Sequence, residues 1–73
     1  MKRYFFDLGS QSQSMYDYQG RELATPEAAC EMAEMMALDL ALAGEWMGWA
    51  VSVLSPEGKR FFSIPVRDAD LVT

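Results

Sequence analysis

Cys30 carries the most reactive side chain in the sequence, a thiol near the expected start of a helix. The positive end of a helix dipole lowers the pKa of a nearby thiol and makes it a better nucleophile. A lone cysteine more commonly serves as a small residue at the side of a core. The chain has no histidine, so it lacks the base that Ser-His-Asp and Cys-His catalysis require. The sequence therefore predicts no catalytic residue and no enzymatic activity.

Four sulfur-bearing side chains cluster in the same segment, and soft ligands of this kind suit Cu(I). The three methionines, however, fall on at least two faces of one helix, and methionine commonly fills gaps in cores. Imidazole ligands are absent and each glycine stands alone, so neither an imidazole metal site nor a phosphate-binding loop is expected. The sequence thus predicts no metal and no cofactor. The four residues are Cys30, Met32, Met35 and Met36.

The charge of the chain limits its partners. Eleven acidic and six basic residues give a formal net charge of −5, which on average repels nucleic acid phosphates and anionic lipids. No apolar run approaches the roughly 18 residues that a membrane-spanning helix needs. The apolar run that follows Met1-Lys2-Arg3 is also too short for a signal peptide. We therefore expect no membrane partner and a protein that stays soluble in the cytoplasm, which fits a single unpaired cysteine.

A long helix between Thr25 and Gly44 organises the chain. Thr25 suits the capping position before the first turn, and Pro26 suits the first helical position, where its missing N–H costs nothing. Gly44 suits the left-handed residue that closes a helix. One face of this helix should meet a sheet. That face consists of Ala29, Met32, Ala33, Met36, Leu40 and Ala43, with Ala37 at its margin.

The outer face of the same helix changes character along its length. Glutamates at positions 27, 31 and 34 occupy its first half, whereas Leu38, flanked by Met35 and Leu42, occupies its second half. A solvated helix face would not normally end in such apolar residues, so we expect another surface to cover it.

Alternation of apolar and polar residues predicts strands at 3–8, 49–54 and 60–66, and a weaker strand at 15–23 that is broken around 17–20. Pro65 cannot donate to a ladder and therefore indicates an edge strand or a strand end. The predicted fold is α+β, a β-hairpin–α–β-hairpin, with a four-stranded, mostly antiparallel sheet and the helix on one face. The expected strand order is second, first, third, fourth. The chain, 1–73, should form a single domain with a loosely ordered tail at 67–73.

Several short motifs are spread along the chain: Arg3-Tyr4-Phe5-Phe6-Asp7, 17–23 with Gly20 and Glu22, Ala28-Ala29, Trp49-x-Val51-x-Val53, Gly58, Ile64-Pro65-Val66 and Asp68-Ala69. Together they resemble a group of very short alphaproteobacterial proteins, common in rhizobia and their relatives, that is classed as a domain of unknown function. The similarity covers nearly the whole chain. Members usually have an Asp-Gly-rich turn after the first strand, where this chain has Gly9-Ser10-Gln11-Ser12. The resemblance supports a single cytoplasmic domain and implies no activity.

Two apolar surfaces are candidate interfaces. One consists of Met35, Leu38 and Leu42 on the helix, and the other pairs Phe5 with Phe61 on the open face of the sheet. The leading hypothesis is a non-catalytic interaction module that forms a homodimer through one of these surfaces, or that binds an unidentified protein.

Two other functions stay open. A small nucleic-acid-associated regulator of the antitoxin type could stack bases on Phe5 and Phe61 beside Arg3 and Arg60. The net acidity argues against this second hypothesis. The third is a ligand carrier or a small enzyme.

Overall fold

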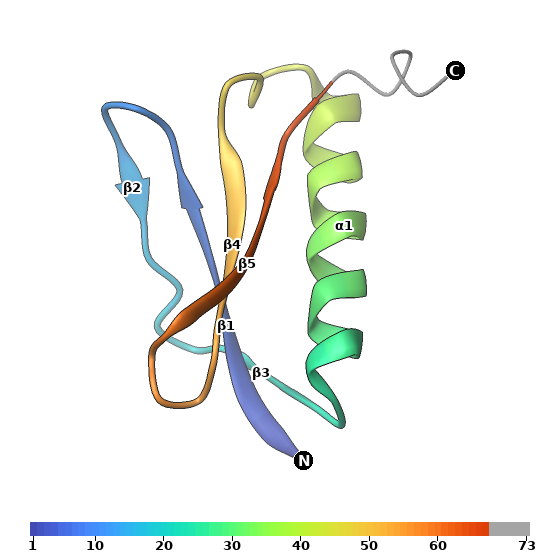
Figure 1. Ribbon diagram of the computed structural model, residues 1–73. Helices are drawn as coiled ribbons and strands as arrows, with labels where there is room; N and C mark the ends of the chain where they lie inside the picture. The colour runs from blue at the N-terminus through green and yellow to red at the C-terminus, as the bar shows by residue number, and fades with distance from the viewer. Residues whose placement is uncertain (68–73) are drawn as a thin grey trace.

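The computed structural model describes residues 1–67. One helix packs against one face of an antiparallel sheet, and the other face of the sheet is left open (Figure 1). The α+β class predicted from the sequence is confirmed. Of the predicted tail at 67–73, all but Arg67 lies outside the described residues. The elements are β1 (Lys2–Gly9), β2 (Ser14–Met15), β3 (Arg21–Leu23), α1 (Pro26–Ala43), β4 (Ala50–Leu54) and β5 (Arg60–Pro65).

The strands run in the order β2-β1-β4-β5, and β3 pairs with β1 as well. The predicted second strand is therefore two short strands that share one edge of β1, so five strands form where four were expected. Leu8 pairs with Met15 at one end of β1, and Arg3 pairs with Glu22 at the other. The predicted order is otherwise confirmed.

Both ends of α1 are capped as the sequence predicts. The Thr25 hydroxyl oxygen accepts the backbone N–H of Ala28 at 3.0 Å, and Pro26 takes the first helical position. Gly44 has a φ of 81°, and its N–H donates to the carbonyls of Leu40 and Ala41. Within the described residues, no helix combines the length and the apolar character needed to cross a membrane.

The face of α1 that meets the sheet is a line of alanines. Ala29, Ala33 and Ala37 are buried, and their spacing of four residues places them along one side of the helix. Side chains this small let the helix approach the sheet closely, while larger residues on either side, such as Met36, fill the remaining space. Two details of the predicted face are wrong: Ala37 is central rather than marginal, and Ala43 is exposed.

The sheet contributes its own apolar face to one core. Val51 and Val53 of β4 are fully buried beneath α1, and Val66 closes the far end, where its N–H donates to the Trp49 carbonyl at 2.8 Å. Because neighbouring residues of a strand point their N–H groups to opposite sides, Pro65 has its missing donor on the free edge of β5. The prediction of an edge strand is confirmed. The buried residues are Tyr4, Phe6, Ala29, Ala33, Ala37, Val51, Val53 and Val66.

Candidate functional surfaces

The outer face of α1 exposes apolar side chains in its second half. Met35 is 68% exposed, Leu38 is 48% exposed and Leu42 is 70% exposed. At about 100° per residue, these side chains lie on the side of the helix opposite its buried alanines. As the sequence predicts, these three side chains face away from the sheet, and residues 1–67 leave them exposed. Their use as an interface stays a prediction.

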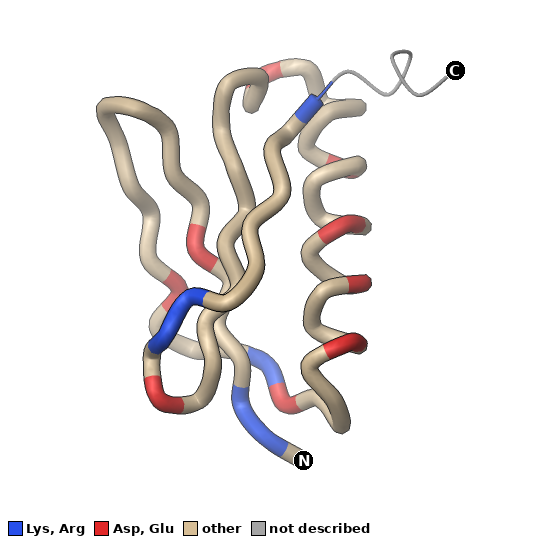
Figure 2. The backbone as a smooth tube through the Cα atoms, in the orientation of Figure 1, with Lys and Arg blue, Asp and Glu red and all other residues tan. Residues whose placement is uncertain are grey.

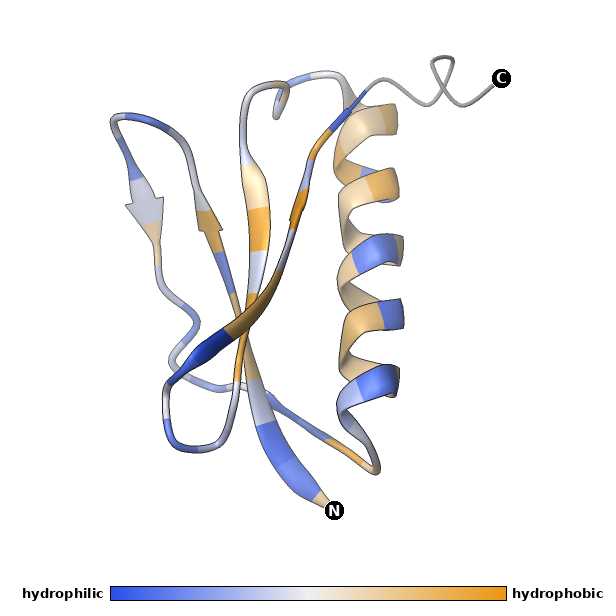
Figure 3. Cartoon of the chain, viewed as in Figure 1, coloured by the Kyte–Doolittle hydropathy of each residue, from blue (hydrophilic) through white to orange (hydrophobic). Residues whose placement is uncertain are grey.

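The first half of the same face is acidic. Glu27, Glu31 and Glu34 are exposed, and α1 carries no lysine or arginine. Figure 2 shows the acidic residues along the helix, with basic residues placed on the strands and their ends. In Figure 3, hydrophilic bands in the first turns of α1 give way to hydrophobic colour toward its C-terminal end. The outer face of α1 therefore combines an acidic half, which repels other negative charges, with an apolar half.

Phe5 and Phe61, the second candidate interface, do not form a common patch. A bulge in β5 pairs Leu54 with Arg60 and Val53 with Phe62, which leaves Phe61 as the extra residue. The ring of Phe61 lies 6.0 Å from that of Tyr4, a residue of the core beneath α1. Phe61, 41% exposed, thus lies on the helix side of the sheet.

Phe5 is half-buried on the opposite, open side, because it alternates with Tyr4 along β1. Its ring packs closely over Gly20, where an added Cβ atom would come within 2.9 Å of a ring atom. The base-stacking platform expected from Phe5 and Phe61 is therefore not assembled.

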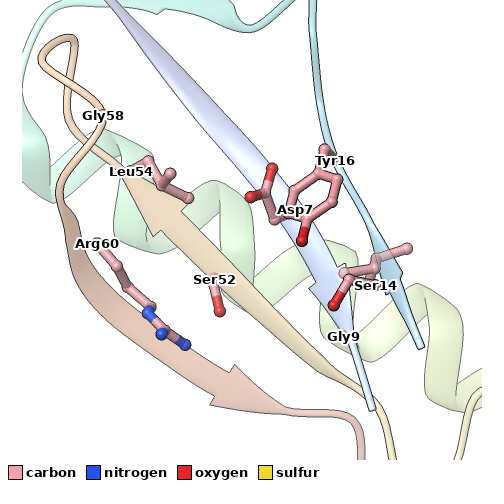
Figure 4. A pocket seen from close by; sticks show the side chains of 9 residues that line it. Asp7, Gly9, Ser14, Tyr16, Ser52, Leu54, Gly58 and Arg60 are labelled. Atoms are coloured by element: carbon pink, nitrogen blue, oxygen red, sulfur yellow. The ribbon is translucent and has the colours of Figure 1, made fainter. Parts of the chain in front are cut away.

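The open face of the sheet holds a groove of about 400 Å³. Asp7 of β1 is paired with Ser52 of β4, and Arg60 enters from β5, beyond Ser52 (Figure 4). The side chains of Tyr16 and Ser14 come from the segment at the other edge of β1. We call this site the open-face groove. Its lining is Asp7, Leu8, Gly9, Ser14, Tyr16, Ser52, Leu54, Gly58 and Arg60.

Opposite charges lie in the open-face groove without contacting each other. Within residues 1–67 the one ion pair joins Arg3 to Glu22 at 3.1 Å, so Arg60 has no acidic partner there. One oxygen of Asp7, Oδ1, accepts the backbone N–H of Asp17 at 2.9 Å, and the Ser52 hydroxyl donates to Ser63 at 3.5 Å. This arrangement of charged and hydroxyl groups suits binding of a polar ligand.

The open-face groove was not predicted from the sequence. The sequence feature that could have indicated it is the alternation of side chains along β1 and β4, which places Asp7 and Ser52 on the face away from the core. Arg60 lies on the same face because it precedes the bulge in β5. No pattern of residue types in the sequence predicts that bulge.

Cys30 is half-buried, and its surroundings do not favour a thiolate. Burial raises the pKa of the Cys30 thiol, and the nearby carboxylates of Glu27, Glu34 and Glu31 raise it further. These effects oppose the helix dipole, so the nucleophile hypothesis is wrong about the direction of the shift. Among residues 1–67, no three cysteine, aspartate or glutamate side chains gather as a metal site would require.

Residues 3–67 match the model of a protein family described as a domain of unknown function, DUF6894. Neither the curated proteins nor the solved structures give a match to the chain.

Proposed function

The chain belongs to the DUF6894 family, and we propose that it is a non-catalytic interaction module in which the outer face of α1 pairs with a second copy of the chain. The observation that carries this proposal is the exposure of Met35, Leu38 and Leu42 on the side of α1 opposite its buried alanines. Removing such residues from water is the main driving force for association of protein surfaces.

The spacing of the three residues favours a second copy over an unrelated partner. Met35 precedes Leu38 by three positions, and Leu42 follows it by four. If two helices cross in antiparallel fashion close to Leu38, each Met35 faces the Leu42 of the second copy, and each Leu38 lies near its own equivalent. A twofold interface requires this kind of self-matching surface.

The distribution of charge favours the same orientation. An antiparallel crossing near Leu38 overlaps only the second halves of the two helices, so Glu27 and Glu31 remain outside the contact. A parallel pairing would align the glutamates of one copy with those of the other, and the repulsion between like charges would destabilise the dimer. Each copy also carries a net charge of −5, so added salt should strengthen the association by screening the repulsion.

The size of the surface sets its affinity. Three apolar side chains per copy fall short of the ≈ 800 Å² per partner that standard interfaces bury. We therefore expect a dimer that forms at micromolar or higher concentration. A small domain has the most to gain from such burial, because its own core is limited.

Sedimentation equilibrium from micromolar to millimolar concentration tests the proposal. The wild type should shift from 8.2 kDa toward twice that mass, and Leu38→Glu should remain a monomer with an unchanged melting curve. Gln11→Glu adds the same charge at an exposed loop position and should still dimerise. A wild type that stays monomeric at millimolar concentration, or a Leu38→Glu variant that dimerises normally, would refute the pairing.

A further inference from the structure

We propose that the open-face groove binds a small zwitterion of amino acid or dipeptide size, with its anionic group on Arg60 and its ammonium group on Asp7. Figure 1 shows that α1 covers one face of the sheet, and the residues that line the groove lie on the other face. The proposal is therefore independent of the pairing through Leu38.

The separation of the two charges carries the inference. Asp7 and Arg60 lie on β1 and β5 with β4 between them, so the two strands are about 10 Å apart, which is two strand spacings. They are also offset along the strands, because Asp7 pairs with Ser52 whereas Arg60 pairs with Leu54. A ligand that carries both charges can bridge this gap, which the two side chains leave open.

Both charged groups keep bonding capacity for a ligand. Within residues 1–67, the guanidinium of Arg60 makes no side-chain hydrogen bond and no ion pair. Its planar set of donors matches a carboxylate or phosphate group. Asp7 uses Oδ1 for the N–H of Asp17, and its Oδ2 has no partner among these residues. An ammonium group that reaches Oδ2 would form a charge-assisted hydrogen bond.

Hydroxyl groups lie in the groove on both sides of Asp7. Ser52 lies on the Arg60 side, whereas Ser14 and Tyr16 lie on the Asp7 side (Figure 4). A hydroxyl both donates and accepts, so these groups suit the remaining polar atoms of a small zwitterion. The volume of about 400 Å³ is at the lower end of the range for ligand pockets, which sets the size of the ligand.

Gly9 offers a way to fill the groove without replacing any of its polar side chains. It occupies the same face of β1 as Asp7, and its φ is not positive. A Cβ atom there would meet only the Gln13 carbonyl at 3.8 Å and the Ser14 hydroxyl at 4.0 Å. Gly9→Val should therefore fold normally and occupy the space that the ligand needs.

An NMR titration of the isotope-labelled full chain tests the proposal with a homologous series of zwitterions: glycine, β-alanine, γ-aminobutyrate and ε-aminocaproate. Acetate and methylammonium serve as probes that carry one charge each. We expect saturable shifts at Asp7, Ser52 and Arg60, and one chain length should bind at least about tenfold more tightly than either single-charge probe.

Three variants identify the site. Arg60→Gln and Asp7→Asn should each weaken binding of the best zwitterion about tenfold, and Gly9→Val should abolish it. The Asn side chain still accepts the N–H of Asp17, so Asp7→Asn keeps the fold. Lys59→Gln removes the same charge one residue from Arg60 and should bind like the wild type. Repeating the titration in Leu38→Glu separates the outcome from dimerisation.

Four results would overturn the proposal. They are no saturable shift with any zwitterion, binding that survives in Arg60→Gln and Gly9→Val, zwitterions that bind no better than acetate, and an Arg60→Gln variant that is destabilised without any ligand response. The last result would mean that Arg60 and Asp7 pair directly across the groove.

Discussion

The carboxylate of Asp7 accepts the backbone N–H of Asp17 at 2.9 Å, and the carboxylate of Asp17 accepts the N–H of Phe6, the residue before Asp7, at 3.1 Å. This exchange falls on the edge of β1 that faces away from β4, in the gap between its pairing with β2 and its pairing with β3. The Asp17 side chain thus supplies the hydrogen bond that a paired strand would otherwise give to β1, and it protects this edge of β1. The carboxylate of Asp17 also accepts the N–H groups of Gln19 and Gly20 at 3.0 Å, and it thereby fixes the turn into β3.

Asp17→Ala should lower the free energy of unfolding by about 2 kcal/mol, because the N–H of Phe6 is part-buried and loses a charged acceptor. Asp17→Asn should cost less, because its one carbonyl oxygen still accepts from the turn. Urea unfolding followed by circular dichroism measures both. Asp39→Ala removes an exposed carboxylate of α1 and serves as the control. Equal stability of Asp17→Ala and Asp39→Ala would show that the exchange with β1 is unimportant.

The same group should make the fold sensitive to acid. Partial burial alone would raise the pKa of Asp17, but the N–H groups of Gly20, Phe6 and Gln19, together with the charge of Arg21, outweigh it and hold the pKa below its ordinary value of 3.8. A carboxyl whose pKa is lower in the folded chain binds protons more readily in the unfolded chain. Its stabilisation is therefore complete above the ordinary pKa and is lost as the pH falls through the folded pKa.

The free energy of unfolding measured in urea should accordingly decline over this acidic window in the wild type. Asp17→Asn should decline less, and the two proteins should approach each other in stability as the pH falls. A decline of the same size in Asp17→Asn would assign the acid sensitivity to other carboxylates.

Gly20→Ala should be far more damaging than Gly44→Ala, although both glycines have a positive φ, 69° and 81°. An added Cβ at Gly20 would lie 2.8 Å from the Arg3 side chain and 2.9 Å from the Tyr4 carbonyl, whereas nothing lies within 4 Å at Gly44. We expect a loss of about 1 kcal/mol at Gly44 from backbone strain, and about 3 kcal/mol at Gly20 from strain and overlap together. Thermal melting of both variants measures the difference, and similar losses would contradict the close packing at Gly20.

The features that could be predicted from the sequence are those set by local chemistry. The ends of α1 follow from Thr25, Pro26 and Gly44, whose conformational preferences do not depend on distant contacts. The position of β5 at the sheet edge follows from Pro65, because a missing N–H is a property of the residue itself. The exposed Leu38 follows from its angular position relative to the buried alanines.

The features that escaped prediction depend on contacts between distant residues. The position of Phe61 is set by a bulge opposite β4 and by the ring of Tyr4, and neither is encoded near Phe61. The break in the second strand was predicted at 17–20, but its cause was not: the Asp17 side chain takes the place of a backbone partner of β1. The open-face groove depends on both features, because Arg60 lies next to the bulge and Tyr16 directly precedes Asp17.

Ala33→Leu should destabilise the fold by about 2 kcal/mol, because Ala33 is fully buried in the line of alanines that faces the sheet. Ala43→Leu makes the same change at an exposed position of the same helix and should alter stability by less than about 0.5 kcal/mol. Thermal melting compares them. If Ala33→Leu were as stable as Ala43→Leu, the alanine line would not set the distance between helix and sheet.

Cys30 should react slowly with a disulfide reagent such as Ellman's reagent at mildly alkaline pH, because burial and then the carboxylates of Glu27, Glu34 and Glu31 raise the pKa of its thiol. A raised pKa means less thiolate at any given pH, so the rate should lie below that of free cysteine and rise as the pH increases. In concentrated urea, which removes the burial, the rate should approach that of free cysteine. The triple variant with Gln at positions 27, 31 and 34 should recover only part of the rate, because burial, the largest single cause, remains. A folded chain that reacts faster than free cysteine would restore the nucleophile hypothesis for Cys30.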